Sequence, residues 1–160
     1  MSMKRSATPA PSSRPPLRCS DTMRRRLSIV GPERSVLEAA KMMRECGCGM
    51  LPVVDADRRV LGILTDRDIV LRACAAGAAL EKTPVSEVMS REVVACNATD
   101  SLQAAQELMI LHQKQRLPVL EGGKLVGVLS LTDIAQVEEP IRVARLLREI
   151  TARERRLEQP

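Results

Sequence analysis

The chain has 160 residues, of which 44% are apolar, and it contains no Phe, Tyr or Trp. Its length favours one compact domain or two small modules that share a core. Without aromatic side chains it lacks the stacking surfaces that commonly hold single-stranded nucleic acid. The formal net charge is +5, but residues 1–26 carry +6, residues 140–160 carry +3 and the middle carries −4. The basic character therefore lies in the two ends, which we interpret as solvated arms rather than as a nucleic-acid interface.

The cysteines and the hydropathy pattern indicate in which cellular compartment the protein is expected. The cysteines are Cys19, Cys46, Cys48, Cys74 and Cys96. An odd count, with no apolar signal-peptide core before them, favours free thiols in a reducing compartment. No apolar run approaches the roughly 18 residues that a membrane span needs. We therefore expect a cytoplasmic protein with no membrane partner.

The middle of the chain repeats itself after a Pro- and Ser-rich basic arm at residues 1–17, which we expect to be disordered. A shift of 66 residues places "SDTMRR" (20–25) on "SEVMSR" (86–91), and "LPVV" (51–54) on "LPVL" (117–120). After one residue is lost in a turn, "LGILTDRDIV" (61–70) falls on "VGVLSLTDIA" (126–135). Two related units, at residues 18–80 and 81–138, are therefore predicted.

Each unit is predicted to run β-α-β-β-α. The expected elements are a strand (27–30; 93–96), a helix (36–46; 102–112), a strand (50–55; 116–121), its hairpin partner (60–65; 125–130) and a second helix. Gly122 and Gly123 indicate a tight hairpin turn, whereas "DADRR" (55–59) implies a longer loop. The fold class is α/β (α+β), with two small sheets flanked by helices and related by a pseudo-twofold. Because one unit could hardly cover its apolar faces alone, we expect the two to pack sheet against sheet.

The last 22 residues, 139–160, are predicted to form a basic amphipathic helix. Pro140 suits a first helical turn. Val143, Leu146, Leu147 and Ile150 then recur at helical spacing, with arginines on the other face. This helix would pack on its own body or form a dimer contact.

Two short patterns could serve local structure alone. Thr65 with Asp68, and Ser130 with Asp133, match Ser/Thr-x-x-Asp, which is typical of a helix start capped by a hydroxyl and an acid. Cys46 and Cys48, with His112, could form a thiol or metal sensor, although purely structural cysteines are favoured and no metal site is predicted. No catalytic constellation occurs beside the single histidine, so we do not expect an enzyme.

The repeated motifs, taken in order, resemble the CBS domain, and the chain looks like the small stand-alone tandem CBS pairs, or Bateman modules, of bacteria and archaea, which include hypoxia- and stress-response types. The resemblance implies a regulatory sensor that binds AMP, ADP, ATP or S-adenosylmethionine in clefts between the repeats, requires no other cofactor, and signals to a partner protein as a homodimer. A ligand-free interaction or scaffold module remains the alternative.

The resemblance also implies ligand residues. Asp68 and Asp133 would accept the ribose hydroxyls, with Thr65 and Ser130 as hydroxyl donors. The remaining candidates are Arg116 and Arg67 for phosphate, Gly62 and Gly127 for close approach, and Leu51, Pro52, Leu117 and Pro118 for adenine. Because the first repeat has Gly49 and Met50 where the second has Gln115 and Arg116, we expect two unequal sites.

Overall fold

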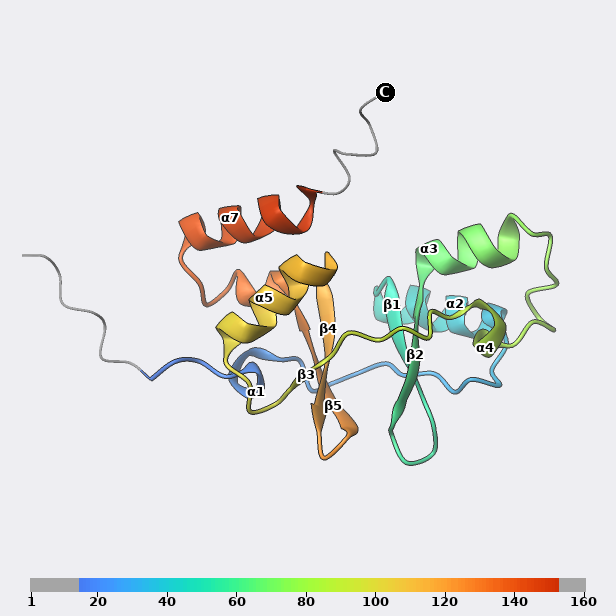
Figure 1. Cartoon of the computed structure of the whole chain (residues 1–160). Coiled ribbons are helices and arrows are strands. Elements are labelled where there is room, and N and C mark those ends of the chain that lie inside the picture. Colours follow the sequence, from blue (N-terminus) through green and yellow to red (C-terminus); the bar gives the residue numbers. More distant parts are fainter. Residues whose placement is uncertain (1–14, 153–160) are drawn as a thin grey trace, which may run out of the picture.

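The computed structural model describes residues 15–152, which form helices and two small sheets (Figure 1). Its elements are α1 (Cys19–Thr22), α2 (Val36–Cys46), β1 (Met50–Val54), β2 (Val60–Thr65), α3 (Asp66–Asp68), the π-helix η1 (Ile69–Cys74), α4 (Val85–Val88), β3 (Cys96–Asn97), α5 (Leu102–His112), β4 (Arg116–Glu121), β5 (Lys124–Ser130), α6 (Leu131–Ile134) and α7 (Pro140–Ile150). The predicted α+β class is confirmed. Most of the predicted arm, residues 1–14, lies outside the described residues.

The two long helices, α2 and α5, span the residues that the apolar periodicity predicts. Ser35 and Ser101 cap their starts, since each hydroxyl accepts a backbone N–H three residues on, at 3.2 and 3.1 Å. Their ends are also alike, because Gly47 and Gln113 both adopt the left-handed conformation, with φ of 62° and 52°. The repeat in sequence is therefore a repeat in local structure.

Two antiparallel hairpins, β1–β2 and β4–β5, form the sheets, and β3 joins β4 in parallel. Gly122 and Gly123 make the second turn with φ of 57° and 77°, which confirms the predicted tight turn. The first hairpin has the expected longer loop, in which Arg58 has a φ of 65°.

The strands predicted to open each repeat are mostly absent. Residues 27–29 form no strand, and Val30 makes only an isolated parallel bridge to Val53. In the second repeat β3 is limited to Cys96 and Asn97. The reason is that the chain is crossing between the two halves of the molecule at these points. Just before, Arg24 pairs with Val128 in β5, and Ser90 pairs with Ile63 in β2.

Each repeat therefore lends its first segment to the other repeat, as the positions of α1 and α4 in Figure 1 show. Cys19 and Met23 are buried with residues of β3–β5, α5 and α7, whereas Val85, Val88 and Met89 are buried with residues of β1, β2, α2 and η1. The expected single shared core is wrong: there are two cores, each covered by its own helices and by one borrowed segment.

Gly62 and Gly127 make this exchange possible. A Cβ atom on Gly62 would lie 2.6 Å from the Met89 Sδ atom, and one on Gly127 would lie 2.8 Å from the Met23 Cγ atom. Only glycine leaves room for these methionines. The close approach predicted for a ligand is thus made by the chain's own borrowed segments, which corrects the role expected of both glycines.

The C-terminal helix packs on its own body. α7 lies along α5 (Figure 1) and buries Leu146 and Ile150 in the second core. Pro140 stands in its first turn, as predicted. Ile141 and Leu147 on the same helix stay 75% and 46% exposed. Within residues 15–152, no helix is both long enough and apolar enough to cross a membrane.

Candidate ligand site

The two Ser/Thr-x-x-Asp patterns are helix caps in the structure. The Thr65 Oγ1 atom accepts the Asp68 backbone N–H at 3.1 Å, and the Asp68 Oδ2 atom accepts the Thr65 N–H at 2.9 Å. Ser130 and Asp133 make the same pair of bonds at 3.2 and 3.0 Å. Each cap uses one carboxylate oxygen, so the other oxygen of each aspartate is free for a different partner.

That second oxygen faces an arginine in both motifs. The Asp133 Oδ1 atom lies 2.7 Å from the Arg24 Nε atom, while the Asp68 Oδ1 atom lies 3.3 Å from an Arg72 Nη atom. Burial by itself would raise the pKa of the nearly buried Asp133 carboxyl. The hydrogen bonds from Ser130 and Arg24 outweigh burial and hold that pKa below its usual range. Asp133 is thus a charged, fully partnered carboxylate, and Asp68 is the looser of the two.

A first cleft of about 900 Å³ opens in front of Thr65 and Asp68. Its opposite wall comes from the other repeat, where residues 113–116 bring in Lys114 and Arg116. Other members of the lining are Arg67 and Arg72, the apolar residues Ile63, Val94 and Pro118, and the acids Asp66 and Glu92. The structure therefore brings the predicted Thr65, Asp68, Arg67, Arg116 and Pro118 to one cavity.

A second, smaller cleft of about 230 Å³ contains Ser130 and Asp133. Pro52 and Arg116 line it as well, so Arg116 reaches both clefts. Its remaining walls include Arg24, Arg26, Cys46, Gly47 and Cys48. The two clefts thus differ in volume and in chemistry.

Several predicted contacts are not in either cleft. Leu51 and Leu117 are fully buried in the two cores, so their predicted place against adenine is wrong. Lys114, Arg72 and Arg24 line the clefts but were not predicted from the sequence. Lys114 stands only two residues before Arg116, in "HQKQR", and could have been found as a second cation before "LPV".

The prediction of free thiols is wrong for two cysteines. Cys46 and Cys48 form a disulfide, while Cys19, Cys74 and Cys96 are free. The two cysteines can close because Gly47 turns the chain between them. His112 lines neither cleft. No group of three metal-ligating side chains occurs among the residues that the structure describes.

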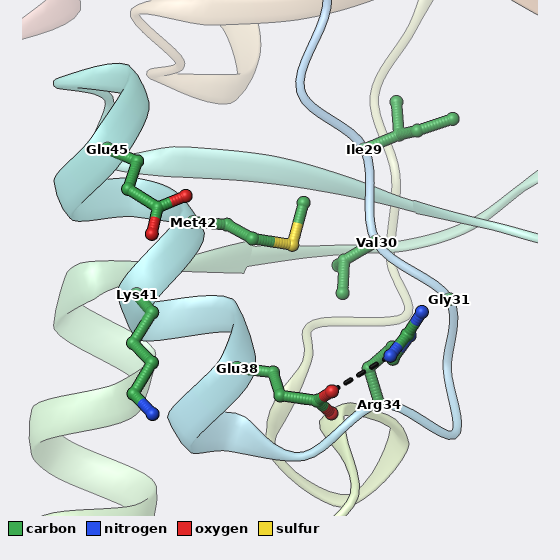
Figure 2. A pocket seen from close by; sticks show the side chains of 8 residues that line it. All are labelled: Ile29, Val30, Gly31, Arg34, Glu38, Lys41, Met42 and Glu45. Atoms are coloured by element: carbon green, nitrogen blue, oxygen red, sulfur yellow. Dashed lines mark hydrogen bonds and ion pairs between the residues drawn. The ribbon is translucent and has the colours of Figure 1, made fainter.

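A third hollow, of about 420 Å³, lies away from both motifs between α2 and residues 29–34 (Figure 2). Arg34 and Glu38 face each other across its floor at 2.8 Å. This ion pair supports the start of α2, where Glu38 also closes a capping box with Ser35. None of the residues predicted for ligand binding lines this hollow.

The fold and the paired clefts define a tandem-repeat module in which each cleft takes residues from both repeats. Residues 19–73 and 85–139 both match the family model described as the CBS domain. The chain therefore belongs to the CBS domain family, whose stand-alone pairs are regulatory modules.

Known relatives agree with this assignment. The CBS domain-containing protein YhcV of Bacillus subtilis is 46% identical over 116 residues, which are 72% of this chain and 81% of that protein. Hypoxic response protein 1 of Mycobacterium tuberculosis is 35% identical over 116 residues, 72% of this chain and 81% of that protein. The crystal structure of Hypoxic Response Protein I, with two coordinated zinc ions, matches with a TM-score of 0.71 at 33% identity and covers 77% of this chain and 100% of that one.

A more distant structure shares the fold alone. The CBS domain pair of protein MJ0100, in complex with 5′-methylthioadenosine and S-adenosyl-L-methionine, matches with a TM-score of 0.68 at 24% identity. The match covers 77% of this chain and 96% of that one.

Proposed function

We propose that this chain is a non-catalytic regulatory module that binds an adenosine-containing ligand, such as AMP, ADP, ATP or S-adenosylmethionine, in its clefts. The carrying observation is the first cleft. Thr65 and Asp68 of one repeat and Lys114 and Arg116 of the other line this single cavity, which has a volume of about 900 Å³. That volume falls within the range of small-molecule sites.

The chemistry of the first cleft suits the parts of a nucleotide. Asp68 keeps one carboxylate oxygen outside the cap, 3.3 Å from Arg72, and this oxygen can accept ribose hydroxyls. Arg116 and Lys114 offer charged donors to phosphate oxygens. Ile63 and Val94, which are partly exposed, provide apolar surface for a base. A single cavity thus holds an acceptor, cations and an apolar wall.

The second cleft is proposed to bind the same kind of ligand more weakly. It has about 230 Å³, and Asp133 is already bound to Arg24 at 2.7 Å. A ligand there must displace Arg24 from the carboxylate, or share it, before its ribose can bind. We therefore expect two classes of site with different affinities.

Binding would regulate because each cleft has walls from both repeats. A ligand that bridges them favours one relative arrangement, by no more than its difference in affinity for the two arrangements. We propose that a partner protein in the cytoplasm detects this change. The setting would be a stress response, as the name of the relative Hypoxic response protein 1 suggests. We also propose a homodimer through the exposed apolar side chains of η1 and α5, since Val70, Leu71 and Leu111 are 56%, 55% and 74% exposed.

A thermal-shift panel tests ligand binding directly. AMP, ADP, ATP, GTP and S-adenosylmethionine are added to the full chain, and a bound ligand raises the melting temperature. A panel in which no adenosine compound shifts the melting temperature contradicts the proposal. Binding by GTP alone would contradict the adenosine preference.

The ribose role is tested by Asp68→Glu. Glutamate is favoured at this capping position, so the cap is retained while the carboxylate moves away from the ribose. Loss of one charge-assisted hydrogen bond costs about 1.5–3 kcal/mol, a fall in affinity of about 10- to 100-fold by titration calorimetry. Asp57→Glu, in the exposed hairpin loop, is the matched control. If Asp68→Glu and Asp133→Glu together leave binding intact, the carboxylates do not hold the ribose.

A further inference from the structure

The disulfide between Cys46 and Cys48 forms part of the wall of the second cleft. Gly47 between them has a φ of 62°, and no atom lies within 4 Å of the place a Cβ would take. This turn brings the two Cα atoms to 5.3 Å, within the usual range for a disulfide. Cys46 is exposed and Cys48 half-buried, so a thiol in solution can reach the pair.

We propose that Cys46 and Cys48 form a thiol–disulfide exchange site, and that its redox state alters the second cleft, whose wall the pair forms in part, more than the first.

The backbone around the pair does not depend on the sulfur–sulfur bond. The pseudo-equivalent loop after α5 has His112, Gln113 and Lys114 in place of Cys46, Gly47 and Cys48. Even so, the Lys114 N–H bonds the Met109 carbonyl at 2.9 Å, as the Cys48 N–H bonds the Met43 carbonyl at 3.1 Å. One loop is therefore folded in this way with no disulfide available to it. Opening the disulfide leaves the other loop with the same backbone bonds.

Each of these loops is also tied to the start of a motif helix. The Gly49 carbonyl accepts the Asp66 N–H at 3.2 Å, and the Gln115 carbonyl accepts the Leu131 N–H at 2.9 Å. The same backbone thus presents a lysine to the first cleft and a disulfide to the second. This difference gives the second cleft a redox group that the first does not have.

The surroundings of the pair favour thiolate chemistry. Arg24, Arg26 and Arg116 line the same cleft, and nearby cations stabilise a thiolate, which is the form that attacks disulfides. The one acid in the lining, Asp133, is already paired with Arg24.

The other three cysteines are not placed for exchange at a cleft. Cys19 and Cys96 are buried, and their thiols donate to the Ser101 and Pro118 carbonyls at 3.8 and 3.9 Å. Cys74 is exposed but lines neither cleft.

The reaction requires a dithiol reductant, such as a small dithiol protein or dithiothreitol. A thiolate of the reductant attacks the more exposed Cys46 Sγ atom, forms a mixed disulfide and releases Cys48 as a thiolate, which takes up a proton. The second thiol of the reductant then closes on its own sulfur and releases Cys46. Two electrons and two protons pass to the protein, and the reductant leaves as a disulfide.

Reduction replaces the neutral disulfide by two thiols, which can ionise, in the cleft that also holds Asp133. We expect negative charge from an ionised thiol to weaken binding of an anionic ligand in the second cleft several-fold and to affect the first cleft less. This consequence rests on the proposed function, whereas the exchange site itself does not.

The test therefore needs no nucleotide. The full chain is equilibrated in mixtures of reduced and oxidised dithiothreitol, and accessible thiols are blocked with N-ethylmaleimide and mapped by mass spectrometry. We expect one accessible thiol, Cys74, in the oxidised protein and three in the reduced protein, with a reversible two-electron transition. Cys74→Ser is the matched control and should keep the transition, whereas Cys46→Ser should abolish it.

Backbone amide spectra test whether the cleft detects the change. On reduction, amides of residues 130–133 should shift, and those of Glu92 and Val94, which line the first cleft from the other repeat, should not. The proposal is overturned if Cys46 and Cys48 stay thiols in every mixture, or if they close and open without moving residues 130–133. Either failure leaves nucleotide binding to be judged by the thermal-shift panel alone.

Discussion

Substitution of Gly127 tests the exchange of segments on which both clefts depend. In Gly127→Ala the new Cβ would overlap Met23, whose Sδ atom is nearest and whose Cγ and Cβ atoms lie 2.8 and 3.1 Å away. Overpacking of this kind costs about 1–3 kcal/mol of unfolding free energy. Met23→Ala on its own should cost about 2–5 kcal/mol, because the Met23 side chain is buried in the second core. In the Met23→Ala background the overlaps with Sδ and Cγ are gone and only the Cβ–Cβ contact at 3.1 Å is left, so adding Gly127→Ala should cost clearly less than it does in the wild-type chain.

Urea unfolding followed by far-ultraviolet circular dichroism measures these free energies at one protein concentration, since the chain lacks Phe, Tyr and Trp for fluorescence. The equivalent pair in the other repeat is the control. A Cβ on Gly62 would also lie 2.8 Å from the Ser90 carbonyl oxygen, which is backbone. Met89→Ala should therefore rescue Gly62→Ala only in part. Additive costs for Gly127→Ala and Met23→Ala would refute the packing of segment 18–24 against β5.

Three further predictions follow from the structure. Since the pKa of Asp133 is lowered on folding, its contribution to stability is present above the ordinary aspartate pKa of about 3.9 and is lost as the pH falls through the folded value. In Asp133→Asn the free energy of unfolding should therefore decrease less steeply as the pH falls below about 4. An unchanged pH dependence would contradict the Arg24–Asp133 pairing. Lys114→Ala should weaken AMP binding by about 10-fold or more in the first cleft only, whereas Arg116→Ala should weaken it in both, because Arg116 lines both. Calorimetry that finds the two variants indistinguishable would exclude this division. On α7, Leu146→Ala should lower the free energy of unfolding in urea by about 2–5 kcal/mol, because Leu146 is buried. Leu147 is half-exposed, so Leu147→Ala should change that free energy by no more than about 0.5 kcal/mol. Equal losses for the two variants would contradict the packing of α7 on α5.

The order of motifs, which is repeated within the chain, predicted the family and the α+β class, but it did not predict which residues share a cavity. Thr65 and Asp68 were predicted to bind a ligand, and they do line the first cleft. The cations opposite them come from a loop nearly fifty residues later, and only one of its two basic residues, Arg116, was predicted. Leu51 and Leu117 were predicted as adenine contacts from the resemblance of their motif, yet both side chains are fully buried in a core. The Leu-Pro-Val segment is buried in both repeats, and this burial depends on helices and borrowed segments from elsewhere in the chain.

The sequence by itself determined the features that arise within a few residues of one another. The serine caps of α2 and α5, the capping boxes at Thr65 and Ser130, and the glycine turn at residues 122–123 each depend on short-range hydrogen bonds or backbone conformation. Such contacts form wherever the local residues allow them, and each of them lies within a single repeat unit.

Only the tertiary structure decided what crosses between the repeats. Three features join residues of different repeats, and the sequence pattern of one repeat does not predict them. They are the borrowed segments around Met23 and Met89, the Arg24–Asp133 ion pair, and the cleft walls built from both repeats. They depend on the path of the irregular chain between each borrowed segment and its own repeat. That path is fixed where Met23 packs against Gly127 and Met89 packs against Gly62. Both contacts join distant parts of the chain, so they depend on tertiary packing.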